Sequence, residues 1–170
     1  FATPILQRPL ELGADLVIHS GTKFLDGQGR VMAGAICGSD KLVNGTFAPL
    51  VRAAGMVLSP FNAWVVLKGI ETLHLRVRAQ CEHALQLARW LEQQPQVEHV
   101  YYPGLQSHPQ HVLAMRQQNG LGGCVLSFTV RADTPEQGRE RAFHVIDSTR
   151  LCRITANLGD VKTTISLPGS

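Results

Sequence analysis

The chain has 170 residues, of which 44% are hydrophobic and 17% are charged, and its formal net charge is +3. This composition is typical of a packed globular protein and excludes an intrinsically disordered chain. Lysine and arginine are scattered, and no apolar run approaches the roughly 18 residues of a membrane helix, so neither a nucleic-acid partner nor a membrane partner is expected.

The first elements are expected to be short. Residues 2–4 read Ala-Thr-Pro, and because a residue before proline avoids the helical region, this start is predicted to be extended. A helical turn is expected to end at Gly13. The apolar run that follows is brief and β-branched, which predicts a buried strand over 15–19.

Two hydroxyls and an amine follow this strand. Ser20, Thr22 and Lys23 come directly after it, and a glycine-rich turn follows at 26–29. Ligands gather at the carboxyl ends of strands in open α/β sheets. An amine there can form a Schiff base and nearby hydroxyls can hold a phosphate, which is what pyridoxal phosphate (PLP) requires. The alternative is a polar turn whose hydroxyls satisfy local backbone groups.

The turn leads into a second buried strand, expected over 31–38, whose small residues suggest close backbone approach. A helix is expected over 40–52, capped by Ser39-Asp40. Pro60 then begins a long helix over about 61–94. Apolar residues at spacings of three and four form one face of that helix: Leu73, Val77, Cys81, Ala84, Ala88 and Leu91.

The remaining elements alternate, which predicts an α/β fold. Asn119-Gly120 is expected to stop a helix that ends near Gln118, and Asp133 or Thr134 is expected to cap the next helix. The last strand leads into a loop at 155–160. Strands are expected at 97–102, 123–130 and 151–154, and helices over about 109–118 and 135–146.

The cysteines and histidines show no metal-binding pattern, so no metal site is expected. Each cysteine lies in an apolar context, so buried free thiols are expected rather than disulfides. This cysteine usage is that of a cytoplasmic protein. The four cysteines are Cys37, Cys81, Cys124 and Cys152.

Several motifs, in order and over nearly the whole chain, resemble the Cys/Met-metabolism family of fold-type-I PLP enzymes. The first is the segment around Lys23, Ser-Gly-Thr-Lys-Phe followed by Asp-Gly-Gln-Gly-Arg. Four others follow it in the family's order, which makes the resemblance specific. They lie at 58–64, 69–73, 101–105 and 156–160.

The resemblance implies a role for each candidate site residue. Lys23 would bind PLP covalently and, once released from the aldehyde, move protons between substrate carbons. Ser20 and Thr22 would donate hydrogen bonds to the PLP phosphate. Asn157 lies where many lyases of the family have serine, in a loop that holds the α-carboxylate of the substrate. Asp26 is expected either to orient the lysine loop or only to close its turn.

The resemblance also implies that the chain is a fragment. Residues 1–75 would be the C-terminal part of the large PLP-binding domain, and 76–170 most of the smaller α+β C-terminal domain. The family's phosphate-cradling glycine loop, ring-stacking tyrosine and pyridine-nitrogen aspartate would lie upstream, and its carboxylate-binding arginine downstream. Residues 166–170 depart from the family's His-Pro-Ala run. This piece alone is expected neither to hold PLP tightly nor to turn over.

The function implied is replacement of the γ-substituent of an O-acylhomoserine, expected to be O-succinylhomoserine, with sulfide to form homocysteine in methionine biosynthesis. Cystathionine γ-synthesis, or γ-elimination from cystathionine or methionine, is the alternative within the family. A non-catalytic remnant that assembles with other chains is the alternative outside it. Relatives are expected to be homotetramers, built as dimers of dimers.

Overall fold

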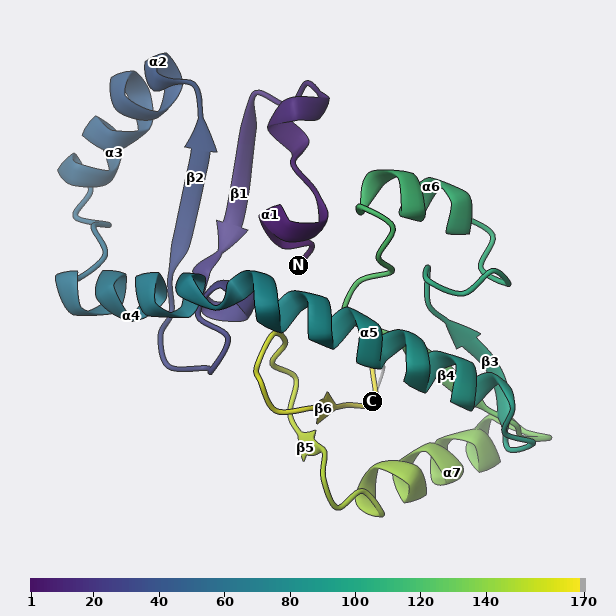
Figure 1. Ribbon diagram of the computed structural model, residues 1–170. Coiled ribbons are helices and arrows are strands. Elements are labelled where there is room, and N and C mark those ends of the chain that lie inside the picture. Colours follow the sequence, from purple (N-terminus) through teal and green to yellow (C-terminus); the bar gives the residue numbers. More distant parts are fainter. Residues whose placement is uncertain (169–170) are drawn as a thin grey trace.

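The computed structural model describes residues 1–168, and its longest helix, α5 (Leu73–Glu92), runs through the middle of the molecule (Figure 1). The first two strands and α1 to α4 lie toward the N-terminal end of α5, and β3, β4 and α7 lie toward its C-terminal end. The other helices are α1 (Thr3–Leu6), α2 (Asp40–Leu42), α3 (Ala48–Ala53), α4 (Pro60–Glu71), α6 (His111–Gln117) and α7 (Pro135–Asp147). The strands are β1 (Leu16–Ser20), β2 (Gly34–Gly38), β3 (Val97–Tyr101), β4 (Ser127–Val130), β5 (Arg153–Ile154) and β6 (Thr164–Ile165).

The first residues are helical, so the expected extended start is wrong. Thr3 has a positive φ of 59°, and α1 begins around the proline that follows it. The reason is tertiary packing, because Leu6 is only 2% exposed and packs in one cluster with Leu73 and Val77 of α5. Gly13 ends the next helical turn in the left-handed conformation, as predicted.

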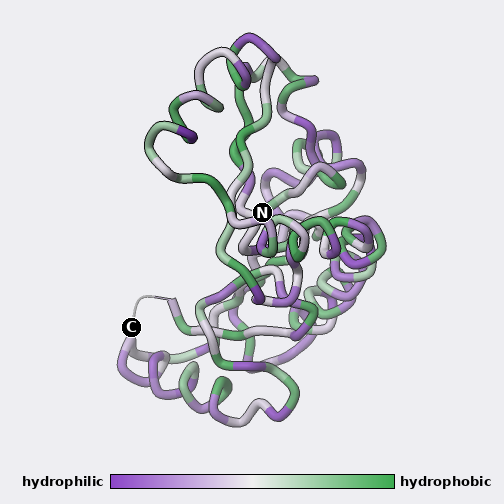
Figure 2. The backbone as a smooth tube through the Cα atoms, turned by 90° about the vertical axis from the view of Figure 1, so that its left-hand side faces the viewer, coloured by the Kyte–Doolittle hydropathy of each residue, from purple (hydrophilic) through white to green (hydrophobic). Residues whose placement is uncertain are grey.

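Strands β1 and β2 form a two-stranded antiparallel sheet in which Ser20 pairs with Gly34. Both strands were expected to be buried, and this is wrong: Ile18 is 78% exposed and Ile36 is 36% exposed. Hydrophobic residues nevertheless lie along the two strands (Figure 2). A strand is buried only where other elements cover its faces, and a sheet of two strands provides little cover.

The long helix expected over 61–94 is two helices, α4 and α5, which meet at Thr72. Thr72 is non-helical, with φ −106° and ψ 3°. The carbonyl of Gly69 accepts a hydrogen bond from Arg76 Nη2 at 2.7 Å and one from the Thr72 hydroxyl at 3.4 Å. These side-chain donors replace regular helical pairing at the junction.

The helix expected over 40–52 is confirmed, since the chain is helical from Asp40 to Ala53. Ser39 caps α2 as predicted, because its hydroxyl accepts the N–H of Leu42 at 3.4 Å. The helix changes type between α2 and α3, where a π-helical segment covers Val43–Phe47 and contains Asn44-Gly45. Asparagine and glycine are poor helix formers, which is consistent with this local change.

The predicted apolar face of α5 is confirmed, since all six of its residues are buried. Its C-terminal half packs against Val100 of β3 and against Tyr102 and Leu105. Strands β3 and β4 pair antiparallel, with Val97 opposite Val130. Strand β4 is shorter than the strand expected over 123–130, and β5 pairs parallel with β6.

The cysteine prediction is confirmed in part. All four are free thiols, and Cys81 is buried. Cys124 and Cys152 are partly buried. Cys37 is exposed, contrary to prediction, because it lies on the uncovered strand β2.

Within residues 1–168, no helix has the length and apolar character that a bilayer crossing requires. Of the divergent segment 166–170, Gly169 and Ser170 lie outside the described residues.

Candidate functional site

Lys23 lies in a single π-turn, Gly21–Leu25, at the end of β1. Its own backbone leaves the helical region, with φ −95° and ψ −126°. The N–H groups of Gly21 and Thr22 both donate to the carbonyl of Ala33, at 2.8 and 3.2 Å. A Cβ at Gly21 would lie 2.7 Å from the Ala33 side chain, so only glycine allows this close approach. We call residues 20–33 the lysine loop.

Asp26 closes the turn of the lysine loop. Its carboxylate is fully buried and accepts the backbone N–H of Arg30 at 2.7 Å, the Arg30 Nε at 2.8 Å and the N–H of Gln28 at 3.3 Å. Burial by itself raises the pKa of Asp26, but the hydrogen bonds and charge of Arg30 outweigh burial and hold the pKa below its ordinary value. The sequence left two roles open for Asp26, and these contacts are those of a turn-closing residue.

The junction of α4 and α5 supports the lysine loop from one side. Arg76 Nη1 donates to the carbonyl of Phe24 at 3.0 Å, while its Nη2 donates to the carbonyl of Gly69. A Cβ at Gly69 would overlap the carbonyl oxygen of Leu25, so glycine is needed where α4 meets the loop. Sequence reasoning missed Arg76 as a positioning residue, because its spacing on α5 is that of an ordinary exposed residue.

The loop at 155–161 covers the lysine loop from another side. Lys23 Nζ donates a hydrogen bond to Asn157 Oδ1 at 2.7 Å, across 134 residues of sequence. The N–H of Val161 donates to the carbonyl of Gly27 at 2.8 Å. Gly159 has φ +87°, and a Cβ there would lie 2.5 Å from the backbone nitrogen of Phe24. The two loops therefore pack backbone against backbone.

The two candidate hydroxyls differ in their surroundings. Ser20 is exposed, and its hydroxyl makes no hydrogen bond within the part of the chain that the structure describes. The Thr22 hydroxyl accepts the N–H of Ala33 at 3.0 Å and donates to the Ala33 carbonyl at 3.3 Å. Ser20 thus has a donor available for a ligand at the end of β1, whereas Thr22 has the local backbone contacts of the alternative interpretation.

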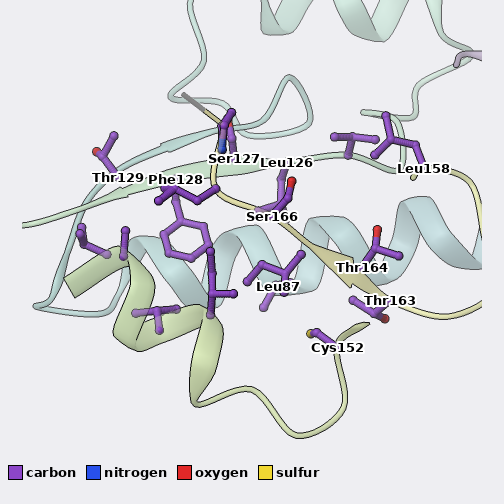
Figure 3. Close-up of a pocket in the computed structure, with 18 of the residues that line it drawn as sticks. Leu87, Leu126, Ser127, Phe128, Thr129, Cys152, Leu158, Thr163, Thr164 and Ser166 are labelled. Atoms are coloured by element: carbon purple, nitrogen blue, oxygen red, sulfur yellow. The ribbon is translucent and has the colours of Figure 1, made fainter. Parts of the chain in front are cut away.

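A cavity of about 980 Å³ lies between α5, β4, α7 and the C-terminal segment (Figure 3), and Phe24 of the lysine loop and Gly159 of the loop at 155–161 also line it. Neither Lys23 nor Asn157 lines it. Its labelled walls are apolar and hydroxyl side chains, among them Leu87, Leu126 and Phe128. Among residues 1–168, no cluster of three or more His, Cys, Asp or Glu side chains could hold a metal ion.

The donor set around Lys23 fits PLP. An amine at a strand end and a free hydroxyl three residues before it are the groups that a phosphate-bearing aldehyde requires. The Asn157 amide fits as well, since its oxygen faces the amine while its NH2 group makes no hydrogen bond within residues 1–168. That NH2 group can donate to a carboxylate.

Known proteins resemble this chain in sequence and in fold. Residues 1–170 match the model of the family described as Cys/Met metabolism PLP-dependent enzyme. The O-succinylhomoserine sulfhydrylase of Pseudomonas aeruginosa is 54% identical over 170 residues, which are all of this chain and 40% of that protein. The cystathionine beta-lyase of Coxiella burnetii is 42% identical over 169 residues, 99% of this chain and 42% of that protein.

The fold agrees with a solved structure. The cystathionine gamma synthase from Xanthomonas oryzae pv. oryzae, in complex with aminoacrylate and cysteine, superposes with a TM-score of 0.88 at 38% identity. The match covers 98% of this chain and 42% of that one. The chain therefore has part of a fold-type-I PLP enzyme fold, as predicted, and spans about 40% of the length of the relatives it matches.

Proposed function

Because the chain belongs to the Cys/Met metabolism family of PLP-dependent enzymes, we propose that it is the lysine-bearing part of an enzyme that replaces the γ-substituent of an O-acylhomoserine with sulfide. O-Succinylhomoserine is the proposed ester, since the Pseudomonas aeruginosa relative named for it is 54% identical. Succinate would leave from Cγ and homocysteine would form. The observation that carries the proposal is the Lys23 amine, placed at the end of β1 and held by Asn157.

PLP, when bound, supplies the electron sink for this reaction. Lys23 would hold it by the amine, and Ser20 would donate its free hydroxyl to the phosphate. Thr22 would contribute in a different way, by anchoring the loop to Ala33 through both of its hydroxyl bonds. Donation by Thr22 to the phosphate requires its O–H to turn away from the Ala33 carbonyl.

The difference between the two hydroxyls gives a testable prediction. We define the grafted enzyme as the Pseudomonas aeruginosa sulfhydrylase with its matching 170 residues replaced by this chain. In it, Ser20→Ala is expected to weaken PLP binding about tenfold, the effect of losing one hydrogen bond to a charged group. Thermal stability of the PLP-free protein should stay unchanged. Titration of PLP by fluorescence and thermal unfolding measure the two effects.

The matched variant is Thr22→Val, which keeps the side-chain shape and removes both bonds to Ala33. It is expected to lower the stability of the PLP-free protein, unlike Ser20→Ala. An unchanged PLP affinity in Ser20→Ala would remove Ser20 from the proposed phosphate site.

Asn157 is proposed to act on two groups at once. Its Oδ1 accepts a hydrogen bond from Lys23 and so directs the amine, whose lone pair takes a proton from the substrate Cα and returns it later. Its NH2 group is free to donate to the substrate α-carboxylate. A protonated lysine amine only donates and an amide nitrogen does not accept, so the oxygen is the Asn157 atom that faces Lys23 while the amine carries its proton.

We expect Asn157→Ala in the grafted enzyme to lower kcat about tenfold and to raise KM, because both contacts are lost. Steady-state kinetics measure the changes in kcat and KM separately. A rise in KM with unchanged kcat would leave Asn157 as a carboxylate contact without a positioning role. Asn157→Ser is the control, since serine keeps a hydrogen-bonding group in the loop.

The proposed reaction is tested by moving the chain between two hosts. One is the sulfhydrylase of the grafted enzyme, and the other is the Xanthomonas oryzae synthase, which matches over 42% of its own chain. With O-succinylhomoserine and equal sulfide and cysteine, homocysteine is expected from both chimaeras. Cystathionine from the synthase host would mean that the acceptor preference does not come from this chain. Release of ammonia without any thiol acceptor would indicate a lyase.

Three other features of the whole enzyme are proposed because the chain belongs to this family. They are assembly as a homotetramer, a cytoplasmic location and a domain boundary near residue 75. Sizing of the grafted enzyme by light scattering tests the first of them.

A further inference from the structure

Two cysteines that the proposed reaction does not use lie against each other near the lysine loop. Cys81 is on α5 and Cys124 is in the segment before β4, and their Sγ atoms are 3.5 Å apart. A disulfide bond is about 2.05 Å long, so the two sulfurs need to approach by roughly 1.5 Å. Cys81 packs in the same buried cluster as Phe24, the residue after Lys23, and Cys124 packs against that cluster.

Tyr102 holds the two cysteine-bearing segments together. Its hydroxyl lies 3.3 Å from the carbonyl of Cys81 and 2.9 Å from the carbonyl of Gly123, and it donates toward both. The tyrosine is 0% exposed, and a Cβ at Gly122 would lie 2.8 Å from its ring. The backbones next to both thiols are therefore tied to one buried oxygen, which keeps the sulfurs opposite each other.

We propose that Cys81 and Cys124 are a redox modification site, which a peroxide closes reversibly to an intramolecular disulfide. The segment that carries Cys124 can supply the small movement needed, because it is irregular and contains Gly123 in a positive-φ conformation. The pair lies beside the lysine loop, so its oxidation would crosslink the wall behind Phe24 without consuming Lys23.

Access from the cavity described above determines which thiol peroxide reaches first. Cys124 lines it, whereas Cys81 is only 2% exposed and does not. The Cys124 sulfur attacks one peroxide oxygen, so that an S–O bond forms, the O–O bond breaks and the thiol proton leaves in water. The Cys81 sulfur then attacks Cys124, the S–O bond breaks, the S–S bond forms and a second water leaves. Two thiols are oxidised by two electrons, and one peroxide is reduced to two waters.

The pKa shifts of the two thiols favour the second step and oppose the first. The hydrogen bond between the two thiols lowers the pKa of Cys81, although burial opposes this, so Cys81 is the better nucleophile for the second step. The hydrogen bond to Cys81 and burial both raise the pKa of Cys124. The first step should therefore be slower than oxidation of the exposed Cys37.

The test is peptide mapping of the 170-residue chain with Cys37→Ser and Cys152→Ser, so that only the proposed pair remains. After hydrogen peroxide treatment, denaturation, alkylation and trypsin digestion, we expect residues 79–89 crosslinked to 117–131, with a mass lower by two hydrogens. Dithiothreitol should release both peptides. We also expect the oxidised chain to unfold about 5 °C higher, because a crosslink restricts the unfolded chain.

Recovery of both peptides as alkylated thiols, after peroxide treatment continued well beyond complete oxidation of Cys37 in the unsubstituted chain, would overturn the proposal. So would a crosslink in the unsubstituted chain that joins Cys124 to Cys152, the other cysteine that lines the cavity. The variant Cys124→Ala should lose the shift in unfolding temperature. Mapping of the unsubstituted chain needs no folded variant, so the proposal stays testable if a substitution prevents folding.

Discussion

Lys23→Ala is expected to lower kcat of the grafted enzyme by about 10⁴-fold, the upper end of what a positioned acid–base group contributes. The reason is that the same amine has two proposed roles, which are to hold PLP covalently and to move protons between substrate carbons. Lys23→Arg is expected to be nearly as inactive, since a guanidinium keeps its proton at every pH that the protein tolerates. Rate measurements with O-succinylhomoserine and sulfide give both values.

Covalent labelling identifies the amine directly. Borohydride reduction of the grafted enzyme with PLP should fix the cofactor to Lys23 and not to the three other lysines of this chain, Lys41, Lys68 and Lys162. Lys68 is a matched control, because it is partly exposed and pairs with Glu71 at 2.6 Å. Lys68→Ala should keep both labelling and turnover. A label on another lysine of this chain would disprove the proposed role of Lys23.

The spacing of apolar residues along the sequence correctly predicted the face of a helix that is buried. The apolar face of α5 follows from spacings of three and four, and it is buried from Leu73 to Leu91. The break at Thr72 could not be predicted in this way. It depends on the Arg76 guanidinium, which bonds the carbonyl of Gly69 within the junction and that of Phe24 in the lysine loop.

Burial was predicted less well than strand position. Ile18 belongs to an apolar, β-branched run that forms β1, yet the residue is 78% exposed. Composition indicates which residues favour a strand and a buried face, but it does not indicate which element covers that face. Cys37 on β2 is exposed for the same reason.

The candidate site was predicted as separate residues and not as contacts. Sequence motifs indicated Lys23 and Asn157 as candidates, but no local periodicity relates positions 134 residues apart, so their hydrogen bond is known only from the fold. Thr22 illustrates the converse. A hydroxyl before a lysine favoured a phosphate ligand over a backbone contact, and only the distances to Ala33 show the backbone contact.

Gly159→Ala is the second substitution with a large expected effect. It tests the packing of the loop at 155–161 against the lysine loop. Gly159 has φ +87°, and a Cβ there would lie 2.5 Å from the nitrogen of Phe24 and 2.7 Å from the carbonyl carbon of Lys23. Both neighbours are backbone, so neither can turn aside as a flexible side chain would. Strain in the left-handed backbone conformation costs about 1–2 kcal/mol, and overpacking costs about 1–3 kcal/mol. Urea unfolding is therefore expected to show a free energy of unfolding lower by about 3 kcal/mol.

Gly13→Ala separates these two costs. Gly13 has φ +97°, close to that of Gly159, but nothing lies within 4 Å of its Cβ position, so only the backbone strain of about 1 kcal/mol should appear. In the grafted enzyme, Gly159→Ala should also lower kcat, because displacing the loop lengthens the bond between Lys23 and Asn157. Gly13→Ala should leave kcat unchanged. Equal losses of stability in the two variants would mean that the loop at 155–161 yields to the methyl group, and that the contact does not position the amine.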